Sequence, residues 1–371
     1  MVRNLNYNYW SNKKVFITGH TGFKGSWMIS WLIKLGANVK GFSLPVDNTN
    51  YLFDKIRNSI EKDIESTYGN ILDINLLKSS IKAFQPDIIF HFAAQPLVLQ
   101  SYKDPIGTWE TNLLGTINVL SSLEEINHKC ILISVTTDKV YKNKEWIYGY
   151  RENDEIGGYD PYSASKAACE LAISSWRSCF SNNSNFEKNQ YKISSVRAGN
   201  VIGGGDWASN RIVPDVVKAL ISSKKVTIRN PNSKRPWQHV LEPLLGYLFL
   251  AESLALEDSD YYDSFNFGPN FSSNKEVKFL VEKILNIWPG KSIIENNQEK
   301  LHETKLLNLN IEKSAELLNW FPQWDFNKTV DVTISWYKNV FEGSDPYQEL
   351  IKNIIEYEAS LEYERNKKFL I

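Results

Sequence analysis

A strand-like run leads directly into a cluster of glycines near the start of the chain, and this feature constrains the fold most strongly. The β-branched run Val15 to Thr18 is followed by Gly19, Gly22 and Gly25 and then by Trp27 to Leu35, an apolar stretch with helical length. Glycines at such a turn permit a tight bend, close approach of a pyrophosphate to the backbone, and close packing of helix on strand. Because the helix N-terminus would face the phosphates, the pattern predicts a dinucleotide site.

Further short apolar runs alternate with helical stretches through the first half of the chain. This alternation is typical of a parallel sheet covered by helices on both faces, so we predict an α/β fold with a doubly wound (Rossmann) sheet. The other predicted strands are Val39 to Ser43, Ile88 to Phe92, Ile131 to Val135 and Ser194 to Arg197, and the other crossover helices are Asn112 to Leu123 and Tyr162 to Arg177.

From about Asn200 the alternation gives way to connections rich in glycine, proline and tryptophan. We therefore expect a smaller, interleaved C-terminal substrate lobe. The predicted domains are a dinucleotide-binding Rossmann domain over residues 11–195, a substrate lobe over 196–345 with some segments returning to the sheet, and a C-terminal helical tail over 346–371. The 12 tryptophans suit either a core or a cleft that binds flat rings.

Composition excludes several classes of partner. The 42 Lys and Arg nearly balance the 43 Asp and Glu, so we expect no nucleic-acid partner and no anionic membrane surface. The N-terminus lacks the apolar core of a signal peptide, and no apolar stretch is long enough to span a bilayer. Cysteines 130, 169 and 179 have no CxxC spacing, which favours reduced core thiols and a cytoplasmic location. Histidines show no metal-ligand spacing, so no metal is expected, and His91 and His239 are interpreted as packed or hydrogen-bonded residues.

Two segments carry the residue types of acid and base catalysis. Tyr162 and Lys166 are four residues apart and share one face of a predicted helix. A tyrosine has an ordinary pKa of about 10, and a neighbouring lysine and a nicotinamide cation both favour its phenolate form. The predicted strand Ile131 to Val135 leads into Thr137, Asp138 and Lys139, at the strand end where this fold carries its chemistry.

Several segments together resemble the CDP-glucose 4,6-dehydratases, a group of nucleotide-sugar dehydratases within the extended short-chain dehydrogenases. Nucleotide-sugar 4,6-dehydratases commonly carry Thr-Asp-Glu where this chain has Thr137, Asp138 and Lys139, and the lysine is a mark of the CDP-glucose group. The similarity extends over roughly residues 10 to 340 and rests on Gly19 to Trp27, Ala93 to Val98, Thr136 to Tyr141, Gly157 to Tyr162, Val196 to Trp207 and Arg235 to Val240.

This resemblance implies an NAD-dependent lyase that converts CDP-glucose to a 4-keto-6-deoxy sugar with no net change in the cofactor. Tyr162 would take the proton of the sugar 4-hydroxyl while C4 gives up hydride, and Thr137 would bind the substrate hydroxyl. Asp138 would protonate the departing 6-hydroxyl. Lys139 would be either the base at C5, which requires a lowered pKa, or a stabiliser of the enolate, and the sequence leaves both roles open.

The resemblance also assigns binding residues. The nucleotide sugar, our predicted partner, would contact Gln95, Asn200, Arg211 and Arg235. NAD would contact Gly19, Thr21, Gly22, Phe23, Gly25, Ser43, Asn70, Ile71, Ala93, Ala94, Tyr162 and Lys166. The chain departs from the family at two places. The second strand ends at Ser43 without the usual acidic residue that binds the adenosine ribose, and that residue normally favours NAD over NADP. Leu99 and Gln100 replace basic residues in a loop near the sugar or the nucleotide, so this second departure concerns the identity of the substrate.

Two alternatives remain at this stage. A nucleotide-sugar 4-epimerase or reductase of the same fold would share the glycine turn, Thr137, Tyr162 and Lys166, but would not require Asp138 and Lys139. A non-catalytic NAD(P)-binding regulator would typically have lost Tyr162 or Lys166. By analogy with the family, we also expect a homodimer through a four-helix interface formed by the helices around Asn112 to Leu123 and Tyr162 to Arg177.

Overall fold

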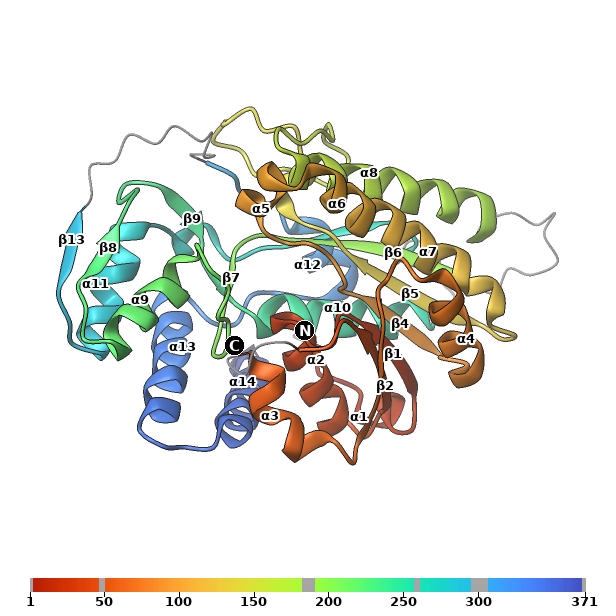
Figure 1. The fold of residues 1–371 in the computed structure, drawn as a ribbon, viewed down its shortest axis with the longest axis horizontal. Helices are drawn as coiled ribbons and strands as arrows, with labels where there is room; N and C mark the ends of the chain where they lie inside the picture. The colour runs from red at the N-terminus through yellow and green to blue at the C-terminus, as the bar shows by residue number, and fades with distance from the viewer. Residues whose placement is uncertain (1–2, 47–50, 182–190, 257–260, 295–305, 369–371) are drawn as a thin grey trace.

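The computed structural model describes residues 3–46, 51–181, 191–256, 261–294 and 306–368. Its centre is a seven-stranded sheet in the order β11-β6-β5-β4-β1-β2-β3, with every neighbouring pair parallel (Figure 1). The strands are β1 (Lys14–Thr18), β2 (Asn38–Ser43), β3 (Ile64–Tyr68), β4 (Ile88–His91), β5 (Cys130–Val135), β6 (Tyr191–Ala198) and β11 (Ser264–Phe267). This is the predicted doubly wound Rossmann fold, and its order reverses between β1 and β4.

Alternating side chains of each strand enter two separate cores. In β1, Phe16 belongs to one core, whereas Val15 and Ile17 belong to the other, as the twofold periodicity of a strand requires. The core containing Phe16 is covered by α4 (Ile74–Phe84), α7 (Gly115–Ser122) and α8 (Pro161–Trp176). The opposite core is covered by α2 (Phe23–Lys34), α3 (Leu52–Ile60) and α10 (Leu241–Leu254).

Each strand predicted from the sequence exists, with ends that differ by up to three residues. Two strands of the sheet were not predicted. β3 reads Ile-Glu-Ser-Thr-Tyr and lies at the sheet edge, where only part of its surface is buried. β11 comes from the range assigned to the second lobe and pairs with β6, because the chain returns to the sheet after α10. The predicted helix Asn112 to Leu123 is also irregular, since a π-helical turn, η1 (Glu110–Leu114), precedes α7.

The second lobe is built from short strand pairs and helices beside the carboxyl ends of β5 and β6 (Figure 1). β7 pairs with β10, β9 with β12 and β8 with β13. The elements are β7 (Val201–Ile202), α9 (Ile212–Ile221), β8 (Val226–Ile228), β9 (Lys234–Pro236), β10 (Gln238–His239), β12 (Asn274–Glu276), α11 (Val277–Ile287), β13 (Ser292–Ile294), α12 (Glu312–Leu318) and α13 (Phe326–Phe341).

Buried aromatic rings join the sheet to the second lobe. The tryptophans fill the core rather than line a cleft in most cases, as with Trp10, Trp27, Trp31, Trp237, Trp320, Trp324 and Trp336. His91 is also buried and hydrogen-bonds Thr18 and Thr116, while His239 packs between Trp27 and Trp324, so both match their predicted packing roles. Cys130 and Cys169 are buried, but Cys179 is exposed, and the prediction of a core position for it was wrong.

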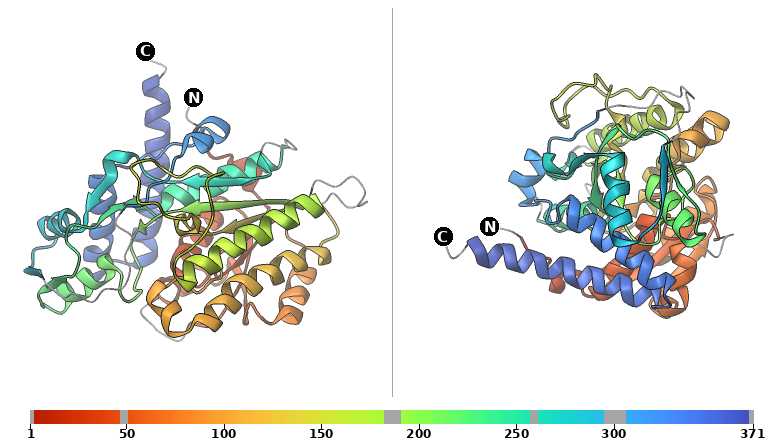
Figure 2. Two further views of the ribbon diagram at one scale, coloured as in Figure 1. Left: turned by 90° about the horizontal axis from the view of Figure 1, so that it is seen from above. Right: turned by 90° about the vertical axis from the view of Figure 1, so that its left-hand side faces the viewer.

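Both ends of the described chain dock on α10 through buried carboxylates. Glu252 accepts hydrogen bonds from Trp10 Nε1 in α1 (Tyr7–Trp10) and from Arg3, both at 2.8 Å. The C-terminal helix α14 (Pro346–Lys368) extends beyond the rest of the molecule (Figure 2), and its Tyr357 hydroxyl donates to Glu242 at 2.6 Å. Leu350 and Ile354 of the same helix are fully buried. In the described residues, no helix combines the length and apolar character needed to cross a membrane.

Glu242 should make the stability of the fold depend on pH. Among the described residues its carboxylate has no cationic partner, and it accepts hydrogen bonds from the backbone amides of Gln323 and Trp324 and from Tyr357. Burial raises its pKa from 4.5 to about 7. Because the folded-state pKa lies above that of the unfolded chain, the contribution is fully present below about pH 4.5 and is lost as pH rises through about 7.

We therefore expect the free energy of unfolding of the wild type, relative to Glu242→Gln, to fall by on the order of 2 to 3 kcal/mol between about pH 5 and about pH 8. Urea denaturation of both proteins across this range measures the difference, in which the other titrating groups cancel. A constant difference across the range would contradict the assignment.

Candidate active site

The glycine turn after β1 lies against the backbone that follows β4. Gly19 has a φ of +75°, and a Cβ atom there would lie 2.7 Å from the amide nitrogen of Ala93. At Gly25 a Cβ would lie 2.2 Å from the Gly19 carbonyl oxygen, so the first turn of α2 can approach the loop only without a side chain. Gly22 is the N-cap residue of α2. The turn therefore forms a closely packed backbone cradle at the N-terminus of α2, at the point where the strand order reverses, and this fits a bound pyrophosphate.

The neighbouring predicted cofactor residues surround this turn. The hydroxyls of Thr21 and Ser43 lie 2.6 Å apart, which joins the loop to the end of β2. Phe23 begins α2 and its ring faces the loop after β7, where a Cβ on Gly203 would lie 3.2 Å from it. Ala93 donates its amide to the Thr18 hydroxyl at 3.2 Å, and Ala94 follows it, half-buried.

Asn70 and Ile71 lie beyond β3. The side-chain oxygen of Asn70 accepts the amide of Leu72 at 3.0 Å and so shapes its own turn. Ile71 is buried against Gly115, and its backbone carbonyl accepts a hydrogen bond from the side-chain Nδ2 of Asn118 at 3.0 Å. The structure thus places Ile71 in the sheet core and leaves Asn70 exposed at the surface.

The start of α8 is fixed by its cap, and this sets the position of the tyrosine and the lysine. Asp160 accepts the Ser163 amide at 2.9 Å, and Pro161 occupies the first helical position, where its missing N–H costs nothing. Tyr162 and Lys166 then lie on one face of the helix, both buried. The Lys166 ammonium donates to the Val135 carbonyl at the end of β5, at 3.1 Å.

The turn after β5 brings Thr137 and Asp138 to the tyrosine. Thr137 caps the short 3-10 helix η3 (Asp138–Val140) and its hydroxyl donates to the Asp138 carboxylate at 3.0 Å. Tyr162 also forms a side-chain hydrogen bond with Thr137. Asp138 is buried close to Gly199, where a Cβ would lie 3.0 Å from its carboxylate oxygen. The turn therefore joins an acid to a phenol through one hydroxyl.

Burial raises the pKa of Tyr162 to about 12, although its hydrogen bond with Thr137 opposes the shift. Burial also raises the pKa of Asp138, against the opposing charge of Lys139, and lowers the pKa of Lys166. Asp138 is therefore more readily protonated than an ordinary aspartate and suited to act as an acid. Tyr162 needs a further positive charge beside it to become a base near neutral pH.

Lys24 belongs to this cluster and was missed by the sequence predictions. It lies in the first turn of α2, and its pKa is lowered to about 8 by burial and by the charge of Arg211. It also interacts electrostatically with Asp138 and Lys166. The available signal was its position, since Lys24 is a charged residue between Phe23 and Gly25 at the start of an otherwise apolar helix.

The predicted substrate residues are of two chemical kinds, two arginines and two residues with neutral side-chain amides. Arg211 and Arg235 interact electrostatically with Tyr162 and Asp138 respectively, so both guanidinium groups face the cluster. Arg211 is held by Asp206 at 2.9 Å, and Arg235 donates to the Lys234 carbonyl at 2.8 Å.

Asn200 and Gln95 are the two residues with neutral side-chain amides. Asn200 is half-buried between β6 and β7. The amide of Gln95 is engaged within its own loop: its Nε2 donates to Thr108 at 2.9 Å and its Oε1 accepts the Leu97 amide at 2.6 Å. In the structure, Gln95 therefore shapes the loop after β4.

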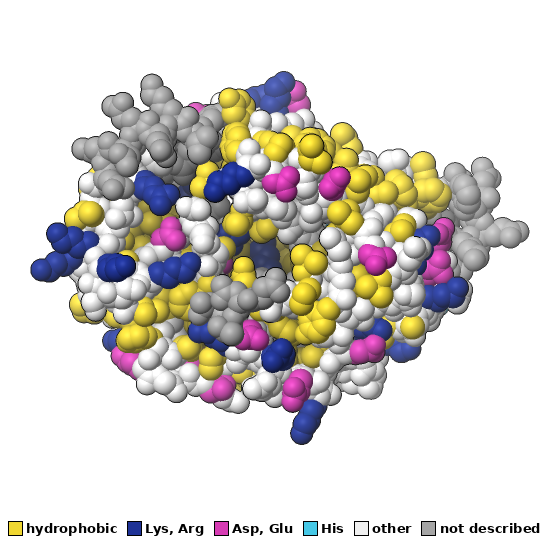
Figure 3. Space-filling view, viewed as in Figure 1, with side chains coloured by type: hydrophobic (Ala, Val, Ile, Leu, Met, Phe, Trp, Pro, Cys, Tyr) yellow, Lys and Arg dark blue, Asp and Glu magenta, His cyan; other side chains and the backbone are white. Residues whose placement is uncertain are grey.

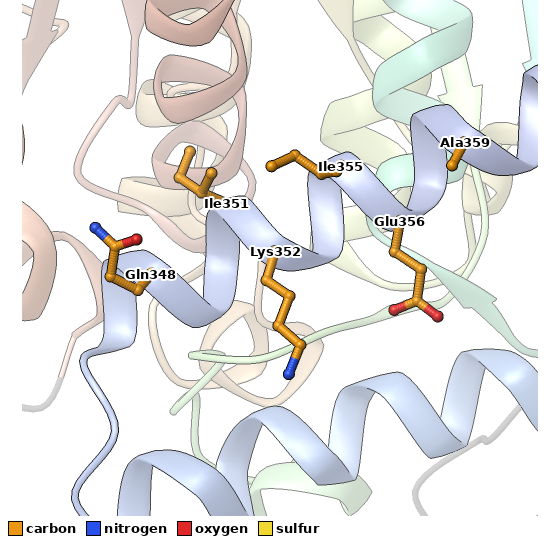
Figure 4. A pocket seen from close by; sticks show the side chains of 6 residues that line it. All are labelled: Gln348, Ile351, Lys352, Ile355, Glu356 and Ala359. Carbon is orange, nitrogen blue, oxygen red and sulfur yellow. The ribbon is translucent and has the colours of Figure 1, made fainter.

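Two hollows on the surface differ in their chemistry. Figure 3 shows one between the sheet domain and the second lobe, with a lysine or arginine side chain at its floor. The other lies on α14 and is lined by Gln348, Ile351, Lys352, Ile355, Glu356 and Ala359. Figure 4 shows Lys352 and Glu356 on the opposite side of that helix from Ile351 and Ile355.

Comparison with known proteins agrees with this geometry. The family model described as GDP-mannose 4,6 dehydratase matches residues 16–333. A CDP-glucose 4,6-dehydratase of Salmonella typhimurium is 43% identical over 342 residues, which cover 92% of this chain and 95% of the relative.

Among solved structures, dTDP-glucose 4,6-dehydratase of Bacillus anthracis has a TM-score of 0.69 at 20% identity and covers 90% of this chain and 99% of that one. UDP-glucose 4-epimerase of Thermotoga maritima has a TM-score of 0.73 at 18% identity and covers 88% and 99%. These two likenesses establish the fold. The family model and the Salmonella relative extend through the glycine turn, the Thr137 turn and α8, and on this basis the chain belongs to the GDP-mannose 4,6-dehydratase family.

Proposed function

We propose that this protein is an NAD-dependent CDP-glucose 4,6-dehydratase. The observation that carries the proposal is the buried carboxyl of Asp138, joined through the Thr137 hydroxyl to the phenol of Tyr162. This places a base for the oxidation at C4 beside an acid for the departing 6-hydroxyl, and the reaction needs both. The 43% identity with the Salmonella CDP-glucose 4,6-dehydratase supports the choice of substrate.

NAD fits the glycine cradle, since the lack of side chains at Gly19 and Gly25 lets the turn pack against Ala93 and brings the N-terminus of α2 close to the loop, where it can meet a pyrophosphate. When bound, it would accept hydride from C4 of the sugar and return it to C6. The residues that hold it in the proposal are Gly19, Thr21, Gly22, Phe23, Gly25, Ser43, Ala93 and Ala94, with Asn70 and Ile71 beyond β3 and with Tyr162 and Lys166 at the reacting end.

The proton transfers are assigned to three side chains. Tyr162 takes the proton of the 4-hydroxyl, and the Lys166 ammonium, anchored on Val135, stabilises the phenolate. Asp138, whose pKa is raised by burial, gives its proton to the departing 6-hydroxyl, which leaves as water. The C5 proton goes either to Lys139 as base or to another group while Lys139 stabilises the enolate, and the two roles remain alternatives.

The diphosphate of the nucleotide is assigned to the cations of the second lobe. Arg235 lies on β9 and Arg211 precedes α9, and both guanidinium groups lie close enough to the catalytic cluster to influence its charges. Guanidinium groups bind phosphate oxygens with two parallel hydrogen bonds. Asn200 is assigned a polar contact in the same region, and Gln95 shapes the loop beside the sugar.

The two alternatives account for less of the site. A 4-epimerase uses the tyrosine and the lysine but eliminates no hydroxyl, so it gives no role to the buried carboxyl of Asp138. A non-catalytic regulator gives no role to the hydrogen bond from Lys166 to Val135 or to the hydrogen bond between Tyr162 and Thr137.

We also propose a cytoplasmic location, supported by the thiols of Cys130, Cys169 and Cys179, which form no disulfide with one another.

Incubation of the protein with CDP-glucose should yield a product lighter by one water, without stoichiometric consumption of added NAD. Product mass and the alkaline absorbance of a 4-keto sugar measure this outcome. An unchanged mass with an inverted C4 would indicate the epimerase, and no reaction with any nucleotide hexose would favour the regulator.

Substitutions in the cluster should separate oxidation from elimination. Tyr162→Phe should lower kcat by about 10² to 10⁴-fold, because the proton of the 4-hydroxyl then has no acceptor. Asp138→Asn should slow loss of water while oxidation continues, so reduced nicotinamide should accumulate during a single turnover. Rapid-mixing absorbance measures this, and Asp345→Asn, at the exposed start of α14, is the matched control. Equal slowing of both steps by Asp138→Asn would contradict its role as the acid of elimination.

We further propose a homodimer formed by α7 and α8 with the adjoining α6 (Pro105–Trp109) and α5 (Val98–Lys103). Large apolar side chains are exposed here: Ile106 is 71% exposed, Leu171 65% and Leu114 48%. Figure 3 shows hydrophobic side chains gathered over this part of the surface. Burying such residues against a second copy of the same helices would give a four-helix interface with twofold symmetry.

Leu171→Arg should convert the proposed dimer to a monomer, because it would bury an unpaired charge on the twofold contact. Light scattering after size-exclusion chromatography measures the mass. Leu256→Arg, an equally exposed leucine after α10, serves as control and should leave the mass unchanged. A wild-type protein that is already monomeric would contradict the proposal.

A further inference from the structure

A buried ion pair lies beneath the turn that carries Thr137 and Asp138. Glu170 and Arg197 are each 3% exposed, and the guanidinium donates to both carboxylate oxygens, from Nε at 3.0 Å and from its second terminal nitrogen at 2.9 Å. The proton transfers assigned above use neither residue. Such a two-point contact fixes the orientation of both side chains as well as their distance.

The pair is bonded to both ends of the catalytic turn. Thr136, immediately before the turn, donates its hydroxyl to Glu170 at 2.5 Å. Tyr141, immediately after it, accepts from the other terminal nitrogen of Arg197 at 2.7 Å and donates to Asn266 at 2.8 Å. The same nitrogen of Arg197 also donates to the Glu152 carbonyl at 2.9 Å. The residues from Thr137 to Val140 are therefore held at both ends by the same two side chains.

One member of the pair, Glu170, also belongs to the helix that carries the base. Glu170 lies one turn of α8 beyond Lys166 and two turns beyond Tyr162, so the three side chains share one face. Its carboxylate further accepts the hydroxyl of Ser195 on β6 at 2.7 Å. One carboxylate thus connects α8, β6 and the end of β5.

Stability alone is a weak explanation for this arrangement. Removing two charges from water costs several kcal/mol per ion, and buried pairs often do no more for stability than apolar residues of similar volume. What an apolar pair would not provide is directed hydrogen bonds to both ends of the turn. The network therefore fits a positioning role better than a purely stabilising one.

We propose that Glu170 and Arg197 are positioning residues that hold the Thr137-Asp138-Lys139 turn at a fixed place relative to Tyr162 and Lys166. The inference rests on the proposed dehydratase function, because that function assigns Tyr162 and Lys166 to the oxidation at C4 and Asp138 to the elimination that follows. Loosening the pair then moves Asp138 relative to the sugar while leaving the NAD cradle and the diphosphate contacts in place. Elimination should suffer more than substrate binding.

Two stacked tyrosines provide a matched test. Tyr141 and Tyr150 are both buried, with ring centroids 5.1 Å apart, but the Tyr150 hydroxyl bonds the Lys144 amide and Asn143 instead of Arg197. Tyr141→Phe should lower kcat about 10-fold with KM changed less than about threefold, and Tyr150→Phe should leave both unchanged.

Glu170→Gln should act more strongly, lowering kcat about 100-fold, since an error of about 1 Å in position can cost that much. Reduced nicotinamide should accumulate in a single turnover of this variant, as elimination falls behind oxidation. Thr136→Val, which removes one hydroxyl and leaves the ion pair intact, provides a variant that should fold if Glu170→Gln does not.

Amide hydrogen exchange over residues 136–141 gives a readout that needs no substrate. Exchange should accelerate in Tyr141→Phe and Thr136→Val but not in Tyr150→Phe. Wild-type protein that forms no product would contradict the proposed function, whereas the exchange result would still report on the turn. An active wild type, with kcat of Tyr141→Phe and Thr136→Val within twofold of it and no change in exchange, would overturn the positioning role.

Discussion

The parallel pairing of the central strands is the constraint on which the rest of the structure depends. Because β1, β4, β5 and β6 all run in one direction, the loops that follow them meet at one edge of the sheet. The glycine turn follows β1, Ala93 follows β4, the Thr137 turn follows β5 and Asn200 follows β6. Residues more than 170 positions apart are thereby gathered around one crevice, and α8 adds Tyr162 and Lys166 from beside the sheet.

Burial then decides the chemistry of the gathered groups. The same apolar surroundings raise the pKa of Asp138 and Tyr162 and lower that of Lys166 and Lys24. The raised pKa keeps more of the aspartate protonated near neutral pH, so it can donate a proton more often. The raised pKa of the tyrosine makes its phenolate scarcer, so it is a poorer base until a cation lies beside it. The positive charges of Lys166 and of an oxidised nicotinamide would supply this need, so the tyrosine would be activated only with its cofactor in place. In our proposal, the ion pair of Glu170 and Arg197 holds the acid and the base at fixed positions relative to each other.

Local patterns predicted the parts of the site that depend on short stretches of chain. The glycine turn and the four-residue spacing of Tyr162 and Lys166 each act within a turn or two of backbone, so the sequence contains the whole signal. Lys24 was missed because its significance comes from Asp138 and Arg211, which are distant in sequence. The hydrogen bonds of the Gln95 side chain with Thr108 and Leu97 could not be foreseen either when the sequence predicted a substrate contact for it, because they depend on how the loop after β4 folds.

The sequence by itself determined five strands of the central sheet, three of its crossover helices, the position of the phosphate cradle and the identities of the acid and base candidates. Alternation of apolar residues, glycine at a positive φ and helix capping are all local effects, and each leaves a pattern in neighbouring residues. Tertiary structure alone decided that β11 is the segment that returns to the sheet, that Cys179 is exposed and that Arg197 pairs with Glu170 beneath the catalytic turn. These depend on which distant surfaces exclude water from one another, and packing across the sheet settles that only once the chain has folded.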